Sequence, residues 1–266
     1  MTPLQRLARR FGYDLTPSKK AKPPSAQLAA VLARFAISCV LDVGANRGQY
    51  GAMLRAWGYR GRIVSFEPLA DAHGALARRA RADRSWQVAP RMALGGQDGE
   101  VEIAVSAESD MSSILPQNAL LKEVSPSSAV IGRETVPLRR LDGVVGSYLT
   151  SEDRVFLKID TQGYEARVLA GAGGLIERLS GIQLEMSLLP IYEGEQDFRT
   201  TFDQLVAAGF EPYLLLSGYF ERKLARQLQV DGVFMRSSAL PEDARPAADD
   251  RRRGAVRRRP RAPVGR

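Results

Sequence analysis

The chain has 266 residues, of which 44% are apolar, and it carries a formal net charge of +8. A chain of this length can bury one sizeable core, and no stretch of it holds the roughly 18 consecutive apolar residues of a membrane span. The N-terminus lacks the apolar run of a signal peptide. One cysteine excludes an internal disulfide, and one histidine excludes a metal site made of several histidines. We expect a soluble, cytoplasmic protein with one α/β domain.

The positive charge is concentrated at the C-terminus. Residues 251–266 contain eight arginines and no acidic residue, so residues 1–250 are electrically balanced. A segment with so few large apolar groups cannot bury enough surface to fold, and we predict a disordered Arg-rich tail over 241–266. Its charge suits peripheral contact with an anionic membrane or with nucleic acid, and we favour a solvated tail without a specific partner over either. The balanced remainder predicts no specific nucleic-acid partner.

Strands and helices alternate along the chain. Short β-branched apolar runs predict strands, and apolar residues at helical spacing predict helices. In chain order we predict a strand over 39–44, a helix over 49–58, a strand over 62–69, a helix over 71–83, strands over 86–94, 99–106 and 154–160, a helix over 164–179, a strand over 181–189, a helix over 198–210, and strands over 211–220 and 230–237. This alternation predicts an α/β fold with a parallel sheet, helices on both faces, and ligands at the carboxyl ends of the strands. We place an N-terminal arm at 1–29 and the folded domain at 30–240.

A long segment rich in Ser and Pro, residues 107–135, shows no clear periodicity. A loop of this length in a compact domain usually has a function or is disordered. Because it follows the third strand region, we expect it to form a lid over the ligand. Ser112 and Ser113 are its candidate contacts to the substrate.

The segment CVLDVGANRGQYGAML joins the first predicted strand to the first predicted helix. A dinucleotide-binding loop requires glycine at the first, third and sixth positions of G-x-G-x-x-G. Counting from Gly44, Asn46 takes the third position and Gln49 the sixth, so the segment disfavours a nicotinamide cofactor. What remains is Asp-x-Gly-x-Asn-x-Gly, which begins at Asp42 and ends at Gly48. An acid at this place suits a ligand that carries cationic groups.

Glu67 ends the second predicted strand, nineteen residues after Gly48. A carboxylate there can accept hydrogen bonds from both hydroxyls of a ribose. Together with Asp42 and Asn46, it predicts a ligand that is a nucleoside with a short zwitterionic arm. S-adenosylmethionine has this chemistry.

Seven segments in order resemble successive blocks of the FkbM-type methyltransferases: VLDVGANRGQYG, VSFEPL, ALGGQDGEVEI, VPLRRLD, FLKIDTQGYEARVLAGA, IQLEMSLLPIYEGE and DGVFMR, within residues 30–236. The resemblance implies a Rossmann-like class I methyltransferase fold with a mostly parallel seven-stranded sheet. It also implies methyl transfer from S-adenosylmethionine to a hydroxyl, often of a sugar or a polyketide. Carried over to this sequence, the cofactor-binding residues are Asp42, Gly44, Asn46 and Gly48 at the methionine arm, Glu67 at the ribose, and Ala93.

Methyl transfer to a hydroxyl requires a base for the departing proton. His73 falls on a predicted helix away from the strand ends, so we expect the base to be an acid. Asp160 ends one predicted strand, and Glu185 lies within the next among apolar neighbours. We predict that Asp160 is the base and that Glu185 orients the acceptor. Two alternatives stay open: Asp160 as the N-cap of the following helix, and Mg²⁺ held by both carboxylates, which nothing in their spacing requires.

Tyr192 and Glu193 follow the Glu185 strand. An aromatic ring beside carboxylates suits the faces and hydroxyls of a sugar, and a solvated loop is the alternative. We therefore predict an S-adenosylmethionine-dependent O-methyltransferase that acts on a sugar hydroxyl of a glycolipid or other glycoconjugate. A polyketide or other small molecule, RNA or protein as acceptor, and a donor-binding protein without activity are the alternatives.

Overall fold

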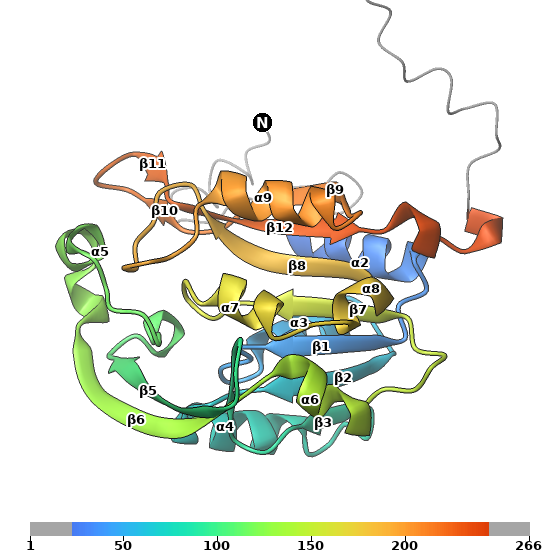
Figure 1. Cartoon of the computed structure of the whole chain (residues 1–266), viewed down its shortest axis with the longest axis horizontal. Helices are drawn as coiled ribbons and strands as arrows, with labels where there is room; N and C mark the ends of the chain where they lie inside the picture. Colours follow the sequence, from blue (N-terminus) through green and yellow to red (C-terminus); the bar gives the residue numbers. More distant parts are fainter. Residues whose placement is uncertain (1–22, 245–266) are drawn as a thin grey trace, which may run out of the picture.

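The computed structural model describes residues 23–244 and contains a main sheet of seven strands in the order β3-β2-β1-β7-β8-β12-β9 (Figure 1). The neighbours from β3 to β8 pair in parallel, and β12 runs antiparallel to both β8 and β9. The predicted mostly parallel seven-stranded sheet is therefore confirmed. The strands are β1 (Cys39–Val43), β2 (Arg62–Phe66), β3 (Trp86–Val88), β7 (Val155–Ile159), β8 (Leu179–Ser187), β9 (Glu211–Ser217) and β12 (Gln229–Met235).

Two apolar layers cover the sheet, as the alternation of side chains along a strand requires. Leu41 of β1 belongs to one layer and its neighbour Val40 to the other. The Leu41 layer is covered by α6 (Leu141–Val144), α7 (Glu165–Ala170), α8 (Leu175–Arg178) and α9 (Phe198–Ala207). The Val40 layer is covered by α2 (Pro24–Arg34), α3 (Gln49–Ala56) and α4 (Ala70–Ala80). No helix among residues 23–244 is long and apolar enough to cross a bilayer.

A second, smaller sheet lies beside the carboxyl ends of the main strands (Figure 1). It consists of β4 (Ala93–Leu94), β5 (Gly99–Ser106) and β6 (Val130–Arg139) in the order β4-β6-β5. The single strand predicted over 86–94 is wrong, because its two ends belong to different sheets. The loop predicted over 107–135 holds α5 (Ala119–Val124) and the start of β6. The first four residues of β6 are exposed, so no alternation marked this strand in the sequence.

Two predicted boundaries also change. The helix predicted over 164–179 divides into α7 and α8, and α7 ends beside Gly171, which packs so closely on Gly95 that a Cβ there would lie 1.9 Å from the Gly95 carbonyl oxygen. The arm predicted over 1–29 ends inside α2, whose Leu28 and Leu32 are buried in the Val40 layer. The helix belongs to the domain for that reason. Within the predicted tail, Glu242–Ala244 forms a 3₁₀ turn, and 245–266 lie outside the described residues.

Candidate active site

A cavity of about 500 Å³ lies where β1, β2 and β7 end. Its wall includes seven of the residues predicted from the sequence: Gly44, Asn46, Glu67, Ala93, Ser112, Ser113 and Asp160. The wall is completed by apolar side chains such as Phe66 and Met92, and by polar ones such as Gln183 and Asp231. A narrow set of polar groups within an apolar cavity is typical of a small-molecule site.

Gly44 brings the loop after β1 into contact with the end of β7. Its φ is +73°, and a Cβ at this position would lie only 1.8 Å from the carbonyl oxygen of Asp160. The amides of Gly44 and Ala45 both donate to the carbonyl of Phe66, at 3.1 and 3.0 Å. Only glycine permits this approach, so the loop between β1 and α3 forms one wall of the cavity directly beside Asp160.

Glu67 is held at the end of β2 by backbone donors. The amide of Asn46 donates to Oε2 at 2.8 Å and the amide of Leu69 donates to Oε1 at 2.9 Å. Burial raises the pKa of Glu67 to about 7, although both amides act to lower it. Glu67 lines the cavity and each oxygen accepts only one of these bonds, so the carboxylate has the capacity to accept further hydrogen bonds from a ligand.

Lys158 joins the ends of β1 and β7 in the wall of the cavity. Its Nζ lies 3.3 Å from Asp42 Oδ1 and 3.4 Å from Asp160 Oδ2, and it donates to the carbonyl of Gly44 at 3.1 Å. Burial lowers the pKa of Lys158, but Asp160 and Asp42 outweigh it and raise the pKa above its usual range. The charged ammonium therefore fixes the Gly44 carbonyl and the Asp160 carboxylate relative to each other.

Asp42 does not take the place that we predicted for it. Its side chain is fully buried, accepts a hydrogen bond from Ser65 Oγ at 3.1 Å, and is absent from the cavity wall. In register, Ser65 and Lys158 flank it on the same face of the sheet. Burial raises the pKa of Asp42, and Lys158 opposes that shift. Asp42 thus acts on the cavity through Lys158 instead of touching a ligand.

Gly48 also lies outside the cavity wall. Its φ is +80°, and a Cβ there would lie 2.9 Å from Leu76 and 3.2 Å from Trp86. The predicted donor contact is therefore replaced by a packing role, in which glycine lets the start of α3 approach α4 and β3 closely.

Asp160 follows β7 and exposes about two fifths of its side chain, with a relative exposure of 39%. The amide of Asp160 donates to the carbonyl of Val43 at 3.1 Å, which fixes the backbone at the cavity edge. Helix α7 begins five residues later with Tyr164 as its N-cap residue, so the interpretation of Asp160 as a helix cap is wrong. Its carboxylate is available to the cavity.

Gln162 connects the groups on this side of the cavity. Its Nε2 donates to Asp160 Oδ1 at 2.9 Å and to Glu185 Oε2 at 3.1 Å, and its Oε1 accepts from Tyr192 Oη at 3.0 Å. The carbonyl of Gln162 accepts from Ser113 Oγ at 2.6 Å. Gln162 thus links four groups through its side chain and its backbone carbonyl: Asp160, Glu185, Tyr192 and Ser113 of the lid.

Glu185 lies behind Gln162 and outside the cavity wall. Its Oε2 also accepts from Gln229 Nε2 at 2.8 Å. Burial, then Asp160 and Glu165, raise the pKa of Glu185 well above its usual range. The structure therefore corrects the direct contact with acceptor that we predicted: Glu185 reaches the cavity only through Gln162.

Within the segment predicted as a lid, 107–135, five of the residues from 109 to 114 line the cavity. Asn46 Nδ2 donates to Ser109 Oγ at 3.3 Å, which ties this segment to the loop after β1. Ser112 Oγ accepts from the amide of Ser106 at 3.0 Å, and both Ser112 and Ser113 line the cavity. Contacts from both halves of the cavity therefore hold the lid in place.

The comparisons with known proteins agree with this geometry. The family model described as the methyltransferase FkbM domain matches residues 42–212, which run from β1 into β9. The chain belongs to the FkbM family of methyltransferases. A comparison with curated proteins finds no match.

Solved structures resemble this FkbM methyltransferase only distantly. The fibrillarin/Nop5p complex is 13% identical, with a TM-score of 0.43 over 78% of this chain and 79% of that one. Aeropyrum pernix fibrillarin in complex with natively bound S-adenosyl-L-methionine is 12% identical, with a TM-score of 0.42 over 79% and 76%. Precorrin-6y C5,15-methyltransferase from Geobacter metallireducens is 11% identical, with a TM-score of 0.40 over 84% and 93%.

Two predicted acceptor residues of this FkbM methyltransferase stand away from the cavity. Tyr192 is 1% exposed and lies in an apolar cluster, from which its hydroxyl reaches Gln162. Glu193 is exposed, and its amide donates to the carbonyl of Pro116 at 2.8 Å. Tyr192 thus supports the wall from behind, and Glu193 belongs to the solvated loop that was the alternative.

Several residues of the site had no signal of their own in the sequence. Lys158 could be placed on the same face as Asp160 by strand period, but its ion pairs could not be predicted. Gln162 has a positive φ of 55°, which is uncommon for a residue other than glycine and marks a constrained position. Within residues 23–244, no three His, Cys, Asp or Glu side chains are grouped to hold a metal ion.

Proposed function

We propose that this FkbM methyltransferase transfers a methyl group from S-adenosylmethionine to a hydroxyl of a sugar, in a glycolipid or another glycoconjugate, in the cytoplasm. The observation that carries the proposal is the position of Asp160. It stands at the cavity edge, beside Gly44 and within reach of the space that Glu67 bounds on the other side.

The donor fits the half of the cavity made by β1 and β2. Glu67 is a buried carboxylate whose oxygens are oriented by two amides and face the cavity, which suits the two hydroxyls of a ribose. Because Gly44 has no side chain, the cationic methionine arm of the donor can approach the backbone carbonyls of this loop closely. An apolar surface that suits the adenine of the donor is formed by Met92, Ala93 and Leu94, which also line the cavity.

Catalysis in this site consists of positioning and proton removal. S-adenosylmethionine supplies a methyl group bonded to a sulfonium, and the acceptor oxygen must lie in line with that bond. The acceptor oxygen forms the new bond to the methyl carbon as the carbon–sulfur bond breaks, and Asp160 takes the hydroxyl proton. Lys158 and Gln162 hold the two oxygens of Asp160. The base is thereby oriented by two residues that themselves line the cavity.

A sugar is the proposed acceptor because the far wall of the cavity offers hydrogen-bonding groups on several elements. Asp160, Gln183, Asp231, Asp110 and Ser113 all line it. Carboxylates and amides spaced around a cavity suit a molecule with several hydroxyls. A polyketide or another small molecule, an RNA or protein acceptor, and donor binding without turnover are the other outcomes of the test.

Purified protein incubated with methyl-labelled S-adenosylmethionine and a panel of glycolipids and free sugars tests the proposal. We expect label in a methyl ether of a sugar, and binding of S-adenosylmethionine but not NAD in calorimetry. Tighter binding of NAD, or label that enters only RNA or protein, would contradict it. Donor binding with no label in any acceptor would indicate a protein without catalytic activity.

A further inference from the structure

A short hairpin near the end of the chain exposes cations and apolar side chains together. It consists of β10 (Phe220–Glu221) and β11 (Arg226–Gln227), and we call residues 219–228 the basic hairpin. Every residue from 222 to 226 is exposed, and these include Arg222, Lys223 and Arg226. Phe220 is 50% exposed and Leu224 43%. Cationic and large apolar groups therefore share one protruding tip.

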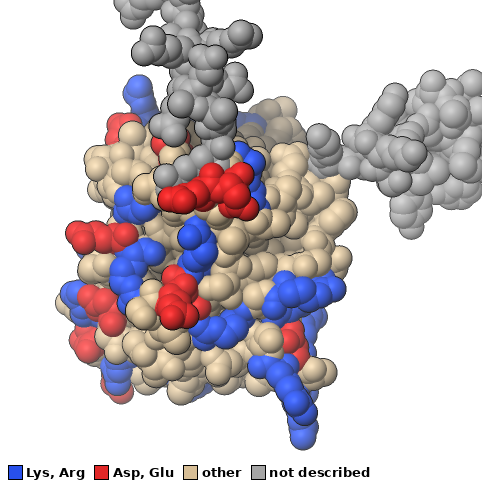
Figure 2. Space-filling model, turned by 90° about the vertical axis from the view of Figure 1, so that its right-hand side faces the viewer, with Lys and Arg blue, Asp and Glu red and all other residues tan. Residues whose placement is uncertain are grey.

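The exposed tip, residues 222–226, contains three cations and no acidic residue, and the nearest acid of the hairpin is Glu221, whose pKa is lowered by the hydrogen bond from Tyr219 and in part by Lys223. Glu221, the only acid of the basic hairpin, is buried and accepts from Tyr219 Oη at 2.7 Å and from the amide of Lys223 at 2.8 Å. Arg222, Lys223 and Arg226 form no ion pair within residues 23–244, whereas arginines elsewhere, such as Arg55 and Arg91, pair with acids. The opposite end of the molecule mixes acidic and basic side chains (Figure 2).

The basic hairpin stands beside the lid of the active site. Its base, Tyr219 and Leu228, packs in the same apolar cluster as Leu121 of α5, Tyr192 and Met111. The hydroxyl of Tyr192 donates to the carbonyl of Met111 at 3.2 Å, and Met111 lies between two residues of the cavity wall. In Figure 1 the hairpin and α5 lie at the same end of the molecule, whereas the turn Glu242–Ala244 lies at the other.

We propose that the basic hairpin docks this methyltransferase on an anionic lipid bilayer, with the active-site lid facing the membrane. The inference rests on the proposed function, since it supplies a lipid-linked sugar as the acceptor. Cations attract the acidic headgroups, and Phe220 and Leu224 insert at the boundary of the acyl chains. Of the two exposed apolar side chains, Phe220 could also stack on a base, whereas Leu224 could not, so the pair together favours a bilayer and binding to single-stranded RNA is the alternative that the test must exclude.

A label at the tip measures docking directly in the full-length protein. Cys39 is the single cysteine and is fully buried, so Leu224→Cys takes an environment-sensitive fluorophore at one place. Ala82→Cys, exposed just after α4, is the matched control. With vesicles of phosphatidylcholine and phosphatidylglycerol that carry brominated acyl chains, we expect quenching at 224 and none at 82. No quenching at 224, or equal quenching at both positions, would overturn the proposal.

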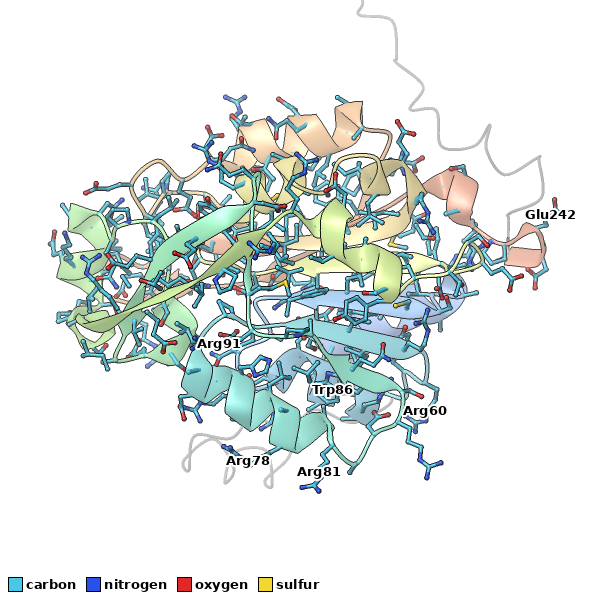
Figure 3. The ribbon with its side chains drawn as sticks, turned by 60° about the horizontal axis from the view of Figure 1, so that its bottom comes forward. Arg60, Arg78, Arg81, Trp86, Arg91 and Glu242 are labelled. Carbon is cyan, nitrogen blue, oxygen red and sulfur yellow. The ribbon has the colours of Figure 1, made fainter. Side chains whose placement is uncertain are left out.

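Charge variants separate the hairpin from the rest of the surface. Replacing Arg222, Lys223 and Arg226 by glutamine should weaken vesicle binding about fivefold per charge, and about a hundredfold together. The control replaces three exposed arginines at the end of α4 by glutamine, Arg78, Arg81 and Arg84, of which the first two extend from the body in Figure 3. We expect less than about a twofold effect in that control. Equal losses in both triple variants would overturn the proposal.

The same variants distinguish this inference from the proposed function and from a nucleic-acid role. If the hairpin variants lost binding to single-stranded RNA but kept binding to vesicles, the surface would serve a nucleic acid and the membrane proposal would fail. Turnover on a water-soluble sugar acceptor should be unchanged in the hairpin variants. If the wild-type protein methylated no acceptor but the label at Leu224→Cys were quenched, the proposed function would be contradicted and the docking inference would stand.

Discussion

The two halves of the active-site cavity are built in different ways. In the donor half, Glu67 accepts from the amides of Asn46 and Leu69, and the amide of Gly44 donates to Phe66, so the groups that shape it are mostly backbone groups at adjoining strand ends. The acceptor half depends largely on side chains, of which Asp160, Glu185, Tyr192 and Ser113 meet at Gln162. Because backbone groups shape the donor half, substitutions there change it little unless they move the chain. In the acceptor half, each hydrogen bond can be removed by a single substitution.

The largest effect is expected in the acceptor half, from the loss of Asp160 as the proton acceptor. Asp160→Asn keeps the shape and the hydrogen bond from Gln162 but removes the proton acceptor. Turnover should fall about 10²-fold or more, while the dissociation constant of S-adenosylmethionine barely changes. Steady-state kinetics and calorimetry measure the two. A wild-type rate would show that Asp160 is not the base, and loss of wild-type activity with a chelator, restored by Mg²⁺, would assign the carboxylate to a metal instead.

The next largest effect is expected on donor affinity, from the loss of the Glu67 carboxylate. Glu67→Ala should weaken donor binding by about 1.5–3 kcal/mol, the range for hydrogen bonds to a charged group. Glu67→Gln is the comparison variant, because it keeps the shape of the side chain but loses the charge and one of the two oxygens that accept from the amides of Asn46 and Leu69. Titration calorimetry of both variants checks the prediction. An affinity equal to wild type in Glu67→Ala would mean that the ribose is bound elsewhere.

Gln162→Ala should disconnect Asp160 from Glu185, Tyr192 and the lid without touching the donor half. We expect kcat to fall about tenfold, comparable to losing one or two hydrogen bonds, with an unchanged donor affinity. In a double-mutant cycle with Asp160→Asn, the two losses should not add, because Gln162 acts through Asp160. Strict additivity would contradict that positioning role.

The donor half should also respond to pH through Glu67. Because its pKa is raised to about 7 by burial, the ionised form that accepts the ribose hydroxyls is lost as the pH falls through about 7. Donor affinity should therefore drop about tenfold between about pH 8 and about pH 6. The Glu67→Gln variant should show a flat profile over that range. A wild-type affinity that rises on acidification would contradict the assignment.

Deletion of residues 251–266 should have the smallest effect. These residues carry the whole net charge and lie outside the matched FkbM domain. We expect unchanged turnover on a soluble acceptor and weaker binding to anionic vesicles at low salt. A large fall in turnover would place the segment at the active site.

The difference between the two halves also explains what the sequence could predict. The alternation of strands and helices along the chain, the Gly44 turn and Glu67 follow from local patterns, since apolar runs, a glycine and an acid at a strand end occupy short stretches of chain. The contacts of Gln162 join residues up to 49 positions apart and have no local pattern. Asp42 was misplaced because a strand end alone does not tell which face a side chain takes. β6 was missed because its first residues are exposed.

The central claim is methylation of a sugar hydroxyl by this protein, and mass spectrometry of glycolipids from cells with and without the gene tests it most directly. We predict that cells lacking the gene contain a glycolipid lighter by the mass of one CH₂ group per missing methyl. The wild-type gene should restore the mass, and the Asp160→Asn gene should not. Identical glycolipid masses in all three strains would contradict the account.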